Sequence, residues 1–105
     1  MTIIGYARSA IPDPASCDRQ EHVLRDSGAA EVYRDDGVSG IGAQRPSWDR
    51  ALSALRPGDT LLVTSADRVG RSAEILRDAV AAVTERGCEL RALDFGSAIT
   101  AAFMA

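Results

Sequence analysis

Lysine is absent from this chain of 105 residues: all twelve basic residues are arginine, and histidine occurs once, as His22. Without a lysine there is no Walker-type phosphate loop, in which that residue contacts the nucleotide phosphates. A single histidine gives little support to a histidine-based catalytic triad or a histidine-rich metal site. We therefore expect any phosphate chemistry to depend on arginine, and we predict no metal site.

Cysteine and long apolar runs are also scarce. Cys17 and Cys88 lie far apart in the sequence without C-x-x-C spacing, which favours two reduced, buried or half-buried thiols over a disulfide. No apolar stretch approaches the length of a membrane span, and the N-terminus lacks the charged-then-apolar pattern of a signal peptide. These absences predict a cytoplasmic protein with no membrane partner.

Net positive charge is missing too. The chain carries 12 arginines against 15 acidic residues, which gives a net charge of −3, so its overall field does not indicate a nucleic-acid partner. The length suits one small domain with a single core. If this domain contacts DNA, it does so through a local cluster of arginines, and another domain or partner supplies most of the affinity.

Short apolar runs alternate with amphipathic segments along the chain. The pattern predicts strands over residues 2–8, 31–34, 60–65 and 88–95, and helices over residues 16–27, 46–55 and 72–86. This order predicts an α/β fold with three layers: a mainly parallel four-stranded sheet, with room for a fifth strand, flanked by helices. Residues 35–44 are rich in glycine and are expected to form a mobile loop, and residues 96–105 look like the start of a further helix.

The apolar positions of each helix indicate which side faces the core. Gly28 is expected to end the first helix, Trp48 to face inward from the second, and Ser72 to cap the third. His22 is expected to be solvated. On the first helix the inner side is predicted to carry Cys17, Gln20, Val23, Leu24 and Ser27.

The segment Asp67-Arg68-Val69-Gly70-Arg71-Ser72 follows an apolar run, at the place where a strand of a parallel sheet should end. Polar chemistry is common at that edge of such a sheet. The guanidiniums of Arg68 and Arg71 suit bidentate contact with phosphate oxygens, and Gly70 allows the backbone to approach a ligand closely. From the pattern alone, an exposed charged turn that caps the next helix explains the segment equally well.

A second polar cluster lies on the first strand, in Gly5-Tyr6-Ala7-Arg8-Ser9. Because side chains alternate along a strand, Tyr6 and Arg8 share one face, while Ala7 and Ser9 point the other way. Together the two segments resemble the serine recombinase family, which comprises the transposon resolvases and the DNA invertases. Further matches lie in the same order along most of the chain: Gln20, Leu24, Val38-Ser39-Gly40, Arg45-Pro46 and Gly58-Asp59.

The resemblance implies a transesterification with no metal ion or other cofactor. In the family, a serine hydroxyl attacks a DNA phosphate and leaves a 5′-phosphoserine link and a free 3′-hydroxyl. Cationic side chains stabilise the charge that develops on the phosphate. The residues that match the family's site are Arg8, Arg45, Arg68 and Arg71 as the catalytic arginines, Asp67 as the group that orients them or assists the leaving oxygen, and Tyr6 and Gln20 as positioning residues.

The sequence departs from the family at the nucleophile. The family's serine lies two residues after the strand arginine, where this chain has Ala10. Ser9 comes one residue early and, in a regular strand, points to the opposite face. A bulge or an early strand end would turn Ser9 toward the arginines and make it the candidate nucleophile. In a regular strand it is a surface hydroxyl at the strand end.

Three functions are compatible with these observations. The first is site-specific DNA recombination, with residues 1–105 as a single resolvase-type catalytic domain without the family's C-terminal dimer helix and helix-turn-helix domain. Such a fragment is expected to be inactive alone and a monomer or weak dimer, whereas the full-length protein would form homo-oligomers on DNA. The second is a catalytically impaired interaction or regulatory module with the same fold. The third is a small nucleotide- or anion-binding module that uses the same arginines.

Overall fold

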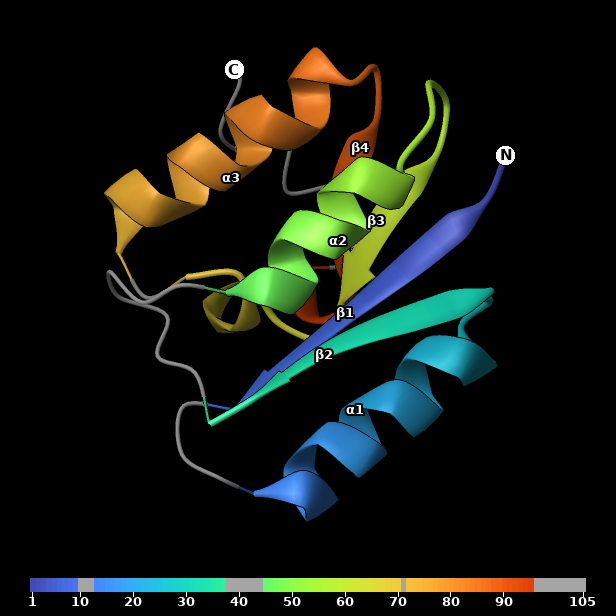
Figure 1. Ribbon diagram of the computed structural model, residues 1–105, viewed down its shortest axis with the longest axis vertical. Coiled ribbons are helices and arrows are strands. Elements are labelled where there is room, and N and C mark those ends of the chain that lie inside the picture. The colour runs from blue at the N-terminus through green and yellow to red at the C-terminus, as the bar shows by residue number, and fades with distance from the viewer. Residues whose placement is uncertain (10–12, 38–44, 71, 96–105) are drawn as a thin grey trace.

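The computed structural model describes residues 1–9, 13–37, 45–70 and 72–95 (Figure 1). Strands and helices alternate along these residues. The strands are β1 (Ile3–Ser9), β2 (Glu31–Asp36), β3 (Thr60–Val63) and β4 (Glu89–Ala92). The helices are α1 (Pro14–Asp26), α2 (Pro46–Ala54) and α3 (Ala73–Glu85), with two 3-10 turns, η1 (Ala66–Arg68) and η2 (Leu93–Phe95).

The four strands form one parallel sheet in the order β2-β1-β3-β4. One face is covered by α1, and the other by α2 and α3 (Figure 1). The predicted three-layer α/β fold is therefore confirmed, and the sheet has four strands within the described residues. Because the strands are parallel, their carboxyl ends meet at one edge of the sheet, which is where polar chemistry is expected.

β3 is a nearly continuous apolar run because both of its faces are covered. Leu61 and Val63 are buried beneath α2 and α3, and Leu62 is buried on the α1 side. Trp48 of α2 lies in the larger core, as predicted, and its ring packs edge-on against Tyr6 of β1. This aromatic contact fixes the first turn of α2 against the strand that carries Arg8.

The core on the α1 side is narrow, because β1 presents Gly5 and Ala7 to the helix. A methyl group on Gly5 would lie 3.3 Å from Leu24 Cβ, which is tighter than an ordinary van der Waals contact. The buried cluster on this side is correspondingly small and consists of Ala7, Leu24, Ala29 and Leu62. The predicted inner side of this helix is wrong at two positions: Val23 is 43 % exposed, and Ser27 is exposed as well.

Two strands extend further than predicted, and the added residues lie at the polar edge of the sheet. β1 continues to Ser9, one residue past its predicted end, and pairs with β2 as far as Asp36. The predicted mobile loop is wrong at Asp35 and Asp36, because both residues belong to β2. Residues 38–44, which include the Val38-Ser39-Gly40 match, and the helix start expected over residues 96–105 lie outside the described residues.

Other differences from the predicted ranges lie at the ends of elements. α1 begins at Pro14, two residues earlier than predicted, because proline suits a first helical turn and the Asp13 side chain caps the helix. β3 ends at Val63 and β4 at Ala92, and each strand is followed by a 3-10 turn. Ser72 caps α3, as predicted, by accepting a hydrogen bond from a backbone N–H of the first turn.

The single histidine and the two cysteines have the exposure that the sequence predicts. His22 is exposed, and Cys17 and Cys88 are buried free thiols. Burial raises the pKa of the Cys17 thiol. None of the helices seen in the described part of the chain has the length and apolar character needed to cross a membrane.

Asp59 ties the start of β1 to the turn before β3. Its Oδ2 accepts the N–H of Arg56 at 2.9 Å, and its Oδ1 accepts the N–H of Thr2 at 2.9 Å. These two backbone donors hold the pKa of the Asp59 carboxyl below its ordinary value. The carboxylate is therefore the form that the fold stabilises.

A pH-dependent stability follows from Asp59. Because its folded pKa is lowered, its contribution to the free energy of unfolding is complete above the ordinary aspartate pKa of about 4 and is lost as the pH falls through the lower folded value. We expect Asp59→Asn to be less stable than the parent at pH 7 and to lose less stability on acidification, as measured by urea unfolding. Asp78→Asn, on the exposed side of α3, is the control. Parallel pH profiles for Asp59→Asn and the parent would contradict this assignment.

Candidate active site

Arginines from three elements meet around η1, at the carboxyl edge of the sheet. Arg8 of β1 is 1 % exposed. Its Nε donates to the main-chain oxygen of Arg68 at 2.8 Å, and its Nη2 donates to that of Asp67. Arg45, just before α2, donates from Nη1 to the main-chain oxygen of Val69. Three successive carbonyls of the segment thus accept hydrogen bonds from two guanidiniums, which fixes the segment to β1 and α2.

The Arg68 side chain in turn binds the backbone of Arg8. Its Nη1 donates to the main-chain oxygen of Arg8 at 3.1 Å, so Arg8 and Arg68 each hold the other's backbone. Its Nε is buried without a hydrogen-bond partner in the described part of the chain. Arg68 as a whole is half-buried, which weakens the screening of its charge by water. The geometry therefore concentrates positive charge beside η1.

Gln20 of α1 holds the backbone of Arg8 from the other side. Its Oε1 accepts the N–H of Arg8 at 3.1 Å, and its Nε2 donates to the Arg8 carbonyl at 3.0 Å. β3 pairs with β1 only as far as Gly5, so the Gln20 carboxamide makes the two hydrogen bonds that a neighbouring strand would otherwise make. Ser16 Oγ accepts the remaining Nε2 hydrogen at 3.2 Å.

Tyr6 and Asp35 form a buried pair beneath the start of α2. The Tyr6 hydroxyl donates to Asp35 Oδ2 at 2.8 Å, and the exposed fractions of the two residues are 0 % and 4 %. Burial, reinforced by the hydrogen bond to Asp35, raises the pKa of Tyr6 far above its ordinary value. Tyr6 is therefore a neutral donor at any physiological pH.

The Asp67 side chain does not join the arginine cluster through the contacts of the described residues. Its carboxylate is exposed and accepts a hydrogen bond from Ser65 Oγ. Only its main-chain oxygen contacts Arg8. Arg71, the remaining arginine of the motif, lies outside the described residues.

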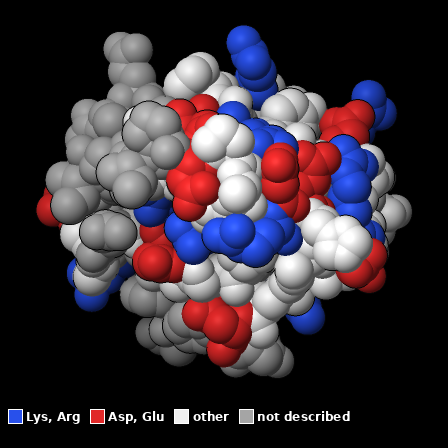
Figure 2. Space-filling view, turned by 90° about the horizontal axis from the view of Figure 1, so that it is seen from below, with Lys and Arg blue, Asp and Glu red and all other residues white. Residues whose placement is uncertain are grey.

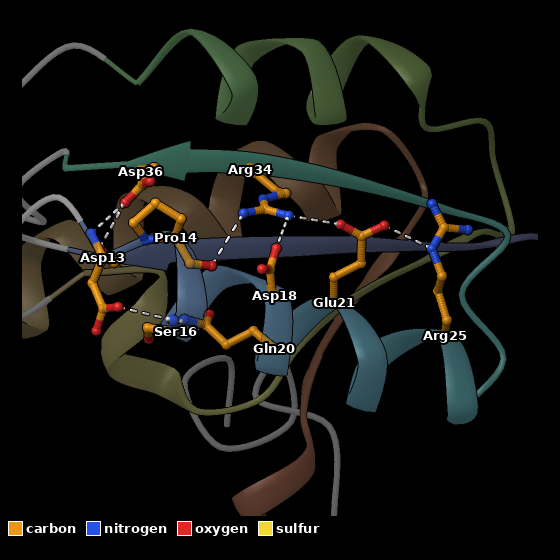
Figure 3. A network of polar contacts seen from close by, with 10 residues as sticks. Asp13, Pro14, Ser16, Asp18, Gln20, Glu21, Arg25, Arg34 and Asp36 are labelled. Carbon is orange, nitrogen blue, oxygen red and sulfur yellow. Dashed lines mark hydrogen bonds and ion pairs between the residues drawn. The ribbon is translucent and has the colours of Figure 1, made fainter.

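Ser9 lies on the opposite face of β1 from the Arg8 side chain. The pairing of β1 with β2 is regular through Ser9 and Asp36, with neither a bulge nor an early strand end. Ser9 Oγ donates to Asp36 Oδ1 at 3.1 Å, and the residue is 4 % exposed. The same Asp36 oxygen accepts the N–H of Asp13 at 2.9 Å (Figure 3). Ser9 is thus engaged with the start of α1, and the prediction of a surface hydroxyl is wrong, because Ser9 is buried. Ala10 lies outside the described residues.

The outer side of α1 carries a different charge pattern from that of the arginine cluster. Arg34 of β2 reaches Asp18 at 2.7 Å and Glu21 at 3.2 Å, and Glu21 also pairs with Arg25 (Figure 3). Arg25, and then Arg34, lower the pKa of Glu21. Figure 2 views the molecule from the α1 side and shows basic and acidic side chains interspersed. This face is therefore not a basic surface.

No group of three or more histidine, cysteine or acidic side chains within the described ranges is arranged to hold a metal ion. The described residues of the site offer guanidiniums that are fixed around a short turn. Such groups bind and stabilise an oxyanion, and the arginine fork matches the geometry of both phosphate and carboxylate.

Comparison with known proteins agrees with this geometry. The family model of the resolvase N-terminal domain matches residues 3–104. The chain belongs to this family. Serine recombinase gin of Escherichia phage Mu is 38 % identical over 91 residues, which are 87 % of this chain and 46 % of that protein. DNA-invertase hin of Salmonella typhimurium is 36 % identical over 93 residues, which are 89 % of this chain and 48 % of that protein.

A solved structure shares the fold of this resolvase-type domain. The crystal structure of the N-terminal catalytic domain of TP901-1 integrase matches with a TM-score of 0.75 and 25 % identity, over 99 % of this chain and 88 % of that one. The similarity to this catalytic domain extends over nearly all of its length. The chain spans about half the length of the curated relatives that it matches.

Sequence reasoning missed Asp35, which links β2 to α2 in this resolvase-type domain. A signal for it exists in the sequence. Pro46 begins a helix that no serine, threonine, aspartate or asparagine precedes directly, so the helix needs a capping group from elsewhere. The alternation of strand residues also places Tyr33 and Asp35 on one face of β2, the face that α2 covers.

Proposed function

We propose that this chain functions in site-specific DNA recombination, as the N-terminal catalytic domain of a serine recombinase. The observation that carries the proposal is the convergence of Arg8, Arg45 and Arg68 on the segment around η1. Arg71 would add a fourth cation to this cluster. The proposed partners are DNA and, in a full-length protein, further copies of the same chain. Residues 1–105 alone are proposed to be a monomer or weak dimer without activity of their own.

The arginines supply charge and hydrogen-bond donors to the reaction. A hydroxyl oxygen forms a bond to phosphorus while the bond to the DNA 3′-oxygen breaks, so negative charge grows on the phosphate oxygens. Arginine keeps its proton in proteins, and the cluster therefore stabilises this charge without acting as an acid. The attacking hydroxyl must lose a proton and the 3′-oxygen must gain one. We assign Asp67, whose carboxylate is exposed, either to assist with the proton on the leaving 3′-oxygen or to orient an arginine.

A second candidate function is that of a catalytically impaired module, which lacks the attack of a serine hydroxyl on the phosphate. The contact of Ser9 with Asp36, on the face away from the Arg8 side chain, favours a catalytically impaired module that keeps the fold and the arginine cluster. For Ser9 to attack a phosphate held by the arginines, its hydroxyl must leave Asp36 and the end of β1 must turn over. The two candidates therefore make different predictions for the hydroxyl at position 9.

The nucleophile is tested by covalent attachment to DNA. The chain is joined to the C-terminal half of serine recombinase gin, and a denaturing gel measures protein linked to DNA that carries the gin recombination site. Recombination by the parent predicts an adduct that Ser9→Ala abolishes, whereas the impaired module predicts no adduct from either protein. Both candidates predict an adduct from Ala10→Ser, because residue 10 of a regular strand would share the face of Arg8.

The assay decides between the two candidate functions and can also contradict the first one. An adduct from the parent that Ser9→Ala abolishes identifies Ser9 as the nucleophile and removes the impaired module. If Ala10→Ser yields no adduct while gin itself does under the same conditions, the proposed recombination function of this domain is contradicted.

A further inference from the structure

The first turn of α2 is capped by a side chain from another element. Arg45 precedes the helix, and within the described residues its own side chain makes no capping hydrogen bond, although the first N–H groups of a helix need acceptors. Asp35 of β2 provides them: Oδ1 accepts the N–H of Ser47 at 3.0 Å, and Oδ2 accepts that of Trp48 at 3.1 Å. The carboxylate also lies at the positive end of the helix dipole. Asp35 therefore determines where α2 begins.

Tyr6 fixes the orientation of the Asp35 carboxylate. Its hydroxyl donates to Asp35 Oδ2, the oxygen that also accepts the N–H of Trp48. The Tyr6 ring packs edge-on against the Trp48 ring, with 5.1 Å between their centroids and 75° between their planes. Backbone and ring of Trp48 are thus both held by this pair, and β1, β2 and α2 meet in one closed, buried unit.

The position of the Arg45 guanidinium depends on this unit. Its Cζ lies 5.0 Å from the centroid of the Trp48 ring, in a cation–π contact. Its Nη1 donates to the Val69 carbonyl beyond η1. A shift of the first turn of α2 would move both the backbone of Arg45 and the ring on which its guanidinium rests.

We propose that Asp35 is a positioning residue for Arg45: it holds the first turn of α2 so that the Arg45 guanidinium rests on Trp48 and reaches the DNA phosphate. This inference rests on the proposed function, which assigns Arg45 to a phosphate. Asp35 itself touches no substrate in this scheme and acts through α2. A displacement of about 1 Å in a group that contacts the reacting atoms can cost about 100-fold in rate.

The first arm of the test needs no DNA. Trp48 is the only tryptophan in the chain, and from the cation–π geometry we expect its ring current to shift the NMR signals of the Arg45 side chain upfield. We expect Asp35→Ala to abolish that shift and Asp35→Asn, which keeps one acceptor oxygen, to retain part of it. Asp59→Asn, which loosens the opposite end of the sheet, should keep the full shift. An unchanged shift in Asp35→Ala, or in Asp35→Asn if the alanine variant does not fold, would overturn the proposal.

The second arm measures coupling between the two residues in the Ala10→Ser chimera. We expect Arg45→Ala to slow adduct formation by about 100-fold and Asp35→Asn to slow it by about tenfold or more. In the Arg45→Ala background, Asp35→Asn should cost less than about twofold, because no arginine remains to be positioned. An undiminished loss in that background would show that Asp35 acts by another route. If the Ala10→Ser chimera forms no adduct at all, the proposed function has failed, and the NMR arm alone decides the positioning role.

Discussion

Replacing Arg8 by methionine is expected to lower the free energy of unfolding by about 2–4 kcal/mol and to abolish DNA attachment by the Ala10→Ser chimera. Methionine fills a similar volume but has no donor, so the carbonyl oxygens of Asp67 and Arg68 lose their hydrogen bonds. A buried acceptor without a partner costs about 1–3 kcal/mol. The loss is partly offset, because a buried guanidinium is itself costly to desolvate. Urea unfolding followed by Trp48 fluorescence measures the change.

Two further variants make the Arg8 prediction specific. Arg8→Lys keeps the charge, but a compact ammonium does not replace a fork that spans two carbonyls, so we expect an intermediate stability and no recovery of attachment. Arg19→Met, on the exposed side of α1, should change stability by no more than about 0.5 kcal/mol. If Arg8→Met is as stable as the parent, Arg8 does not hold η1 in the way described here.

Gly70→Ala is expected to destabilise the domain by about 1–3 kcal/mol, the usual cost of forcing an extra carbon into a packed site. A Cβ on Gly70 would collide with Ile75 Cγ2 and lie 3.0 Å from Ile75 Cβ, in the first turn of α3. These atoms sit close to the helix backbone and cannot move aside without displacing it. Because Arg68 is two residues away, DNA attachment by the Ala10→Ser chimera should fall as well.

A double variant tests the cause of the Gly70 effect. Ile75→Ala removes the colliding methyl group, and because Ile75 is only half-buried, its own cost should be small. We expect Gly70→Ala combined with Ile75→Ala to recover much of the stability that Gly70→Ala loses. Thermal unfolding of the four proteins gives the coupling energy. Additive losses would mean that the contact with Ile75 is not what excludes a side chain at position 70.

Local patterns in the sequence were sufficient to predict the layers of the fold and the face on which Ser9 lies. The apolar run of β3 indicated a strand covered on both sides, because only a buried strand tolerates such a run. Alternation along β1 separated Ser9 from Arg8, and the contact of Ser9 with Asp36 agrees with that separation. Both inferences depend on neighbours in the sequence, which is why they could be made without a structure.

The contacts that hold the site together could not be read from local patterns. Arg8 and the carbonyl of Arg68 are 60 positions apart, and backbone oxygens are the same for every residue type, so the sequence does not mark them as partners. Gly70 is an example of a contact that local sequence patterns do not reveal. Its lack of a side chain suggested a close approach to a ligand, whereas the structure places the side chain of Ile75 against it.

The exposure of Val23 also follows from packing that the sequence does not express directly. Helical periodicity gave α1 an inner side as wide as that of an ordinary amphipathic helix. In the structure only Cys17, Gln20 and Leu24 of this helix are buried, because within the described residues no second helix packs beside α1 on that face of the sheet. The width of a buried helix face therefore depended on the neighbours of the helix in the fold.

In the proposed reaction, arginines around η1 neutralise the charge of a DNA phosphate. The most direct test compares two DNA substrates in the Ala10→Ser chimera, one with a normal phosphate at the cleaved position and one with a neutral methylphosphonate there. Arg68→Ala is predicted to slow attachment by about 100-fold on the phosphate and by much less on the methylphosphonate, because that group carries no charge to neutralise. Equal losses on both substrates would contradict the claim.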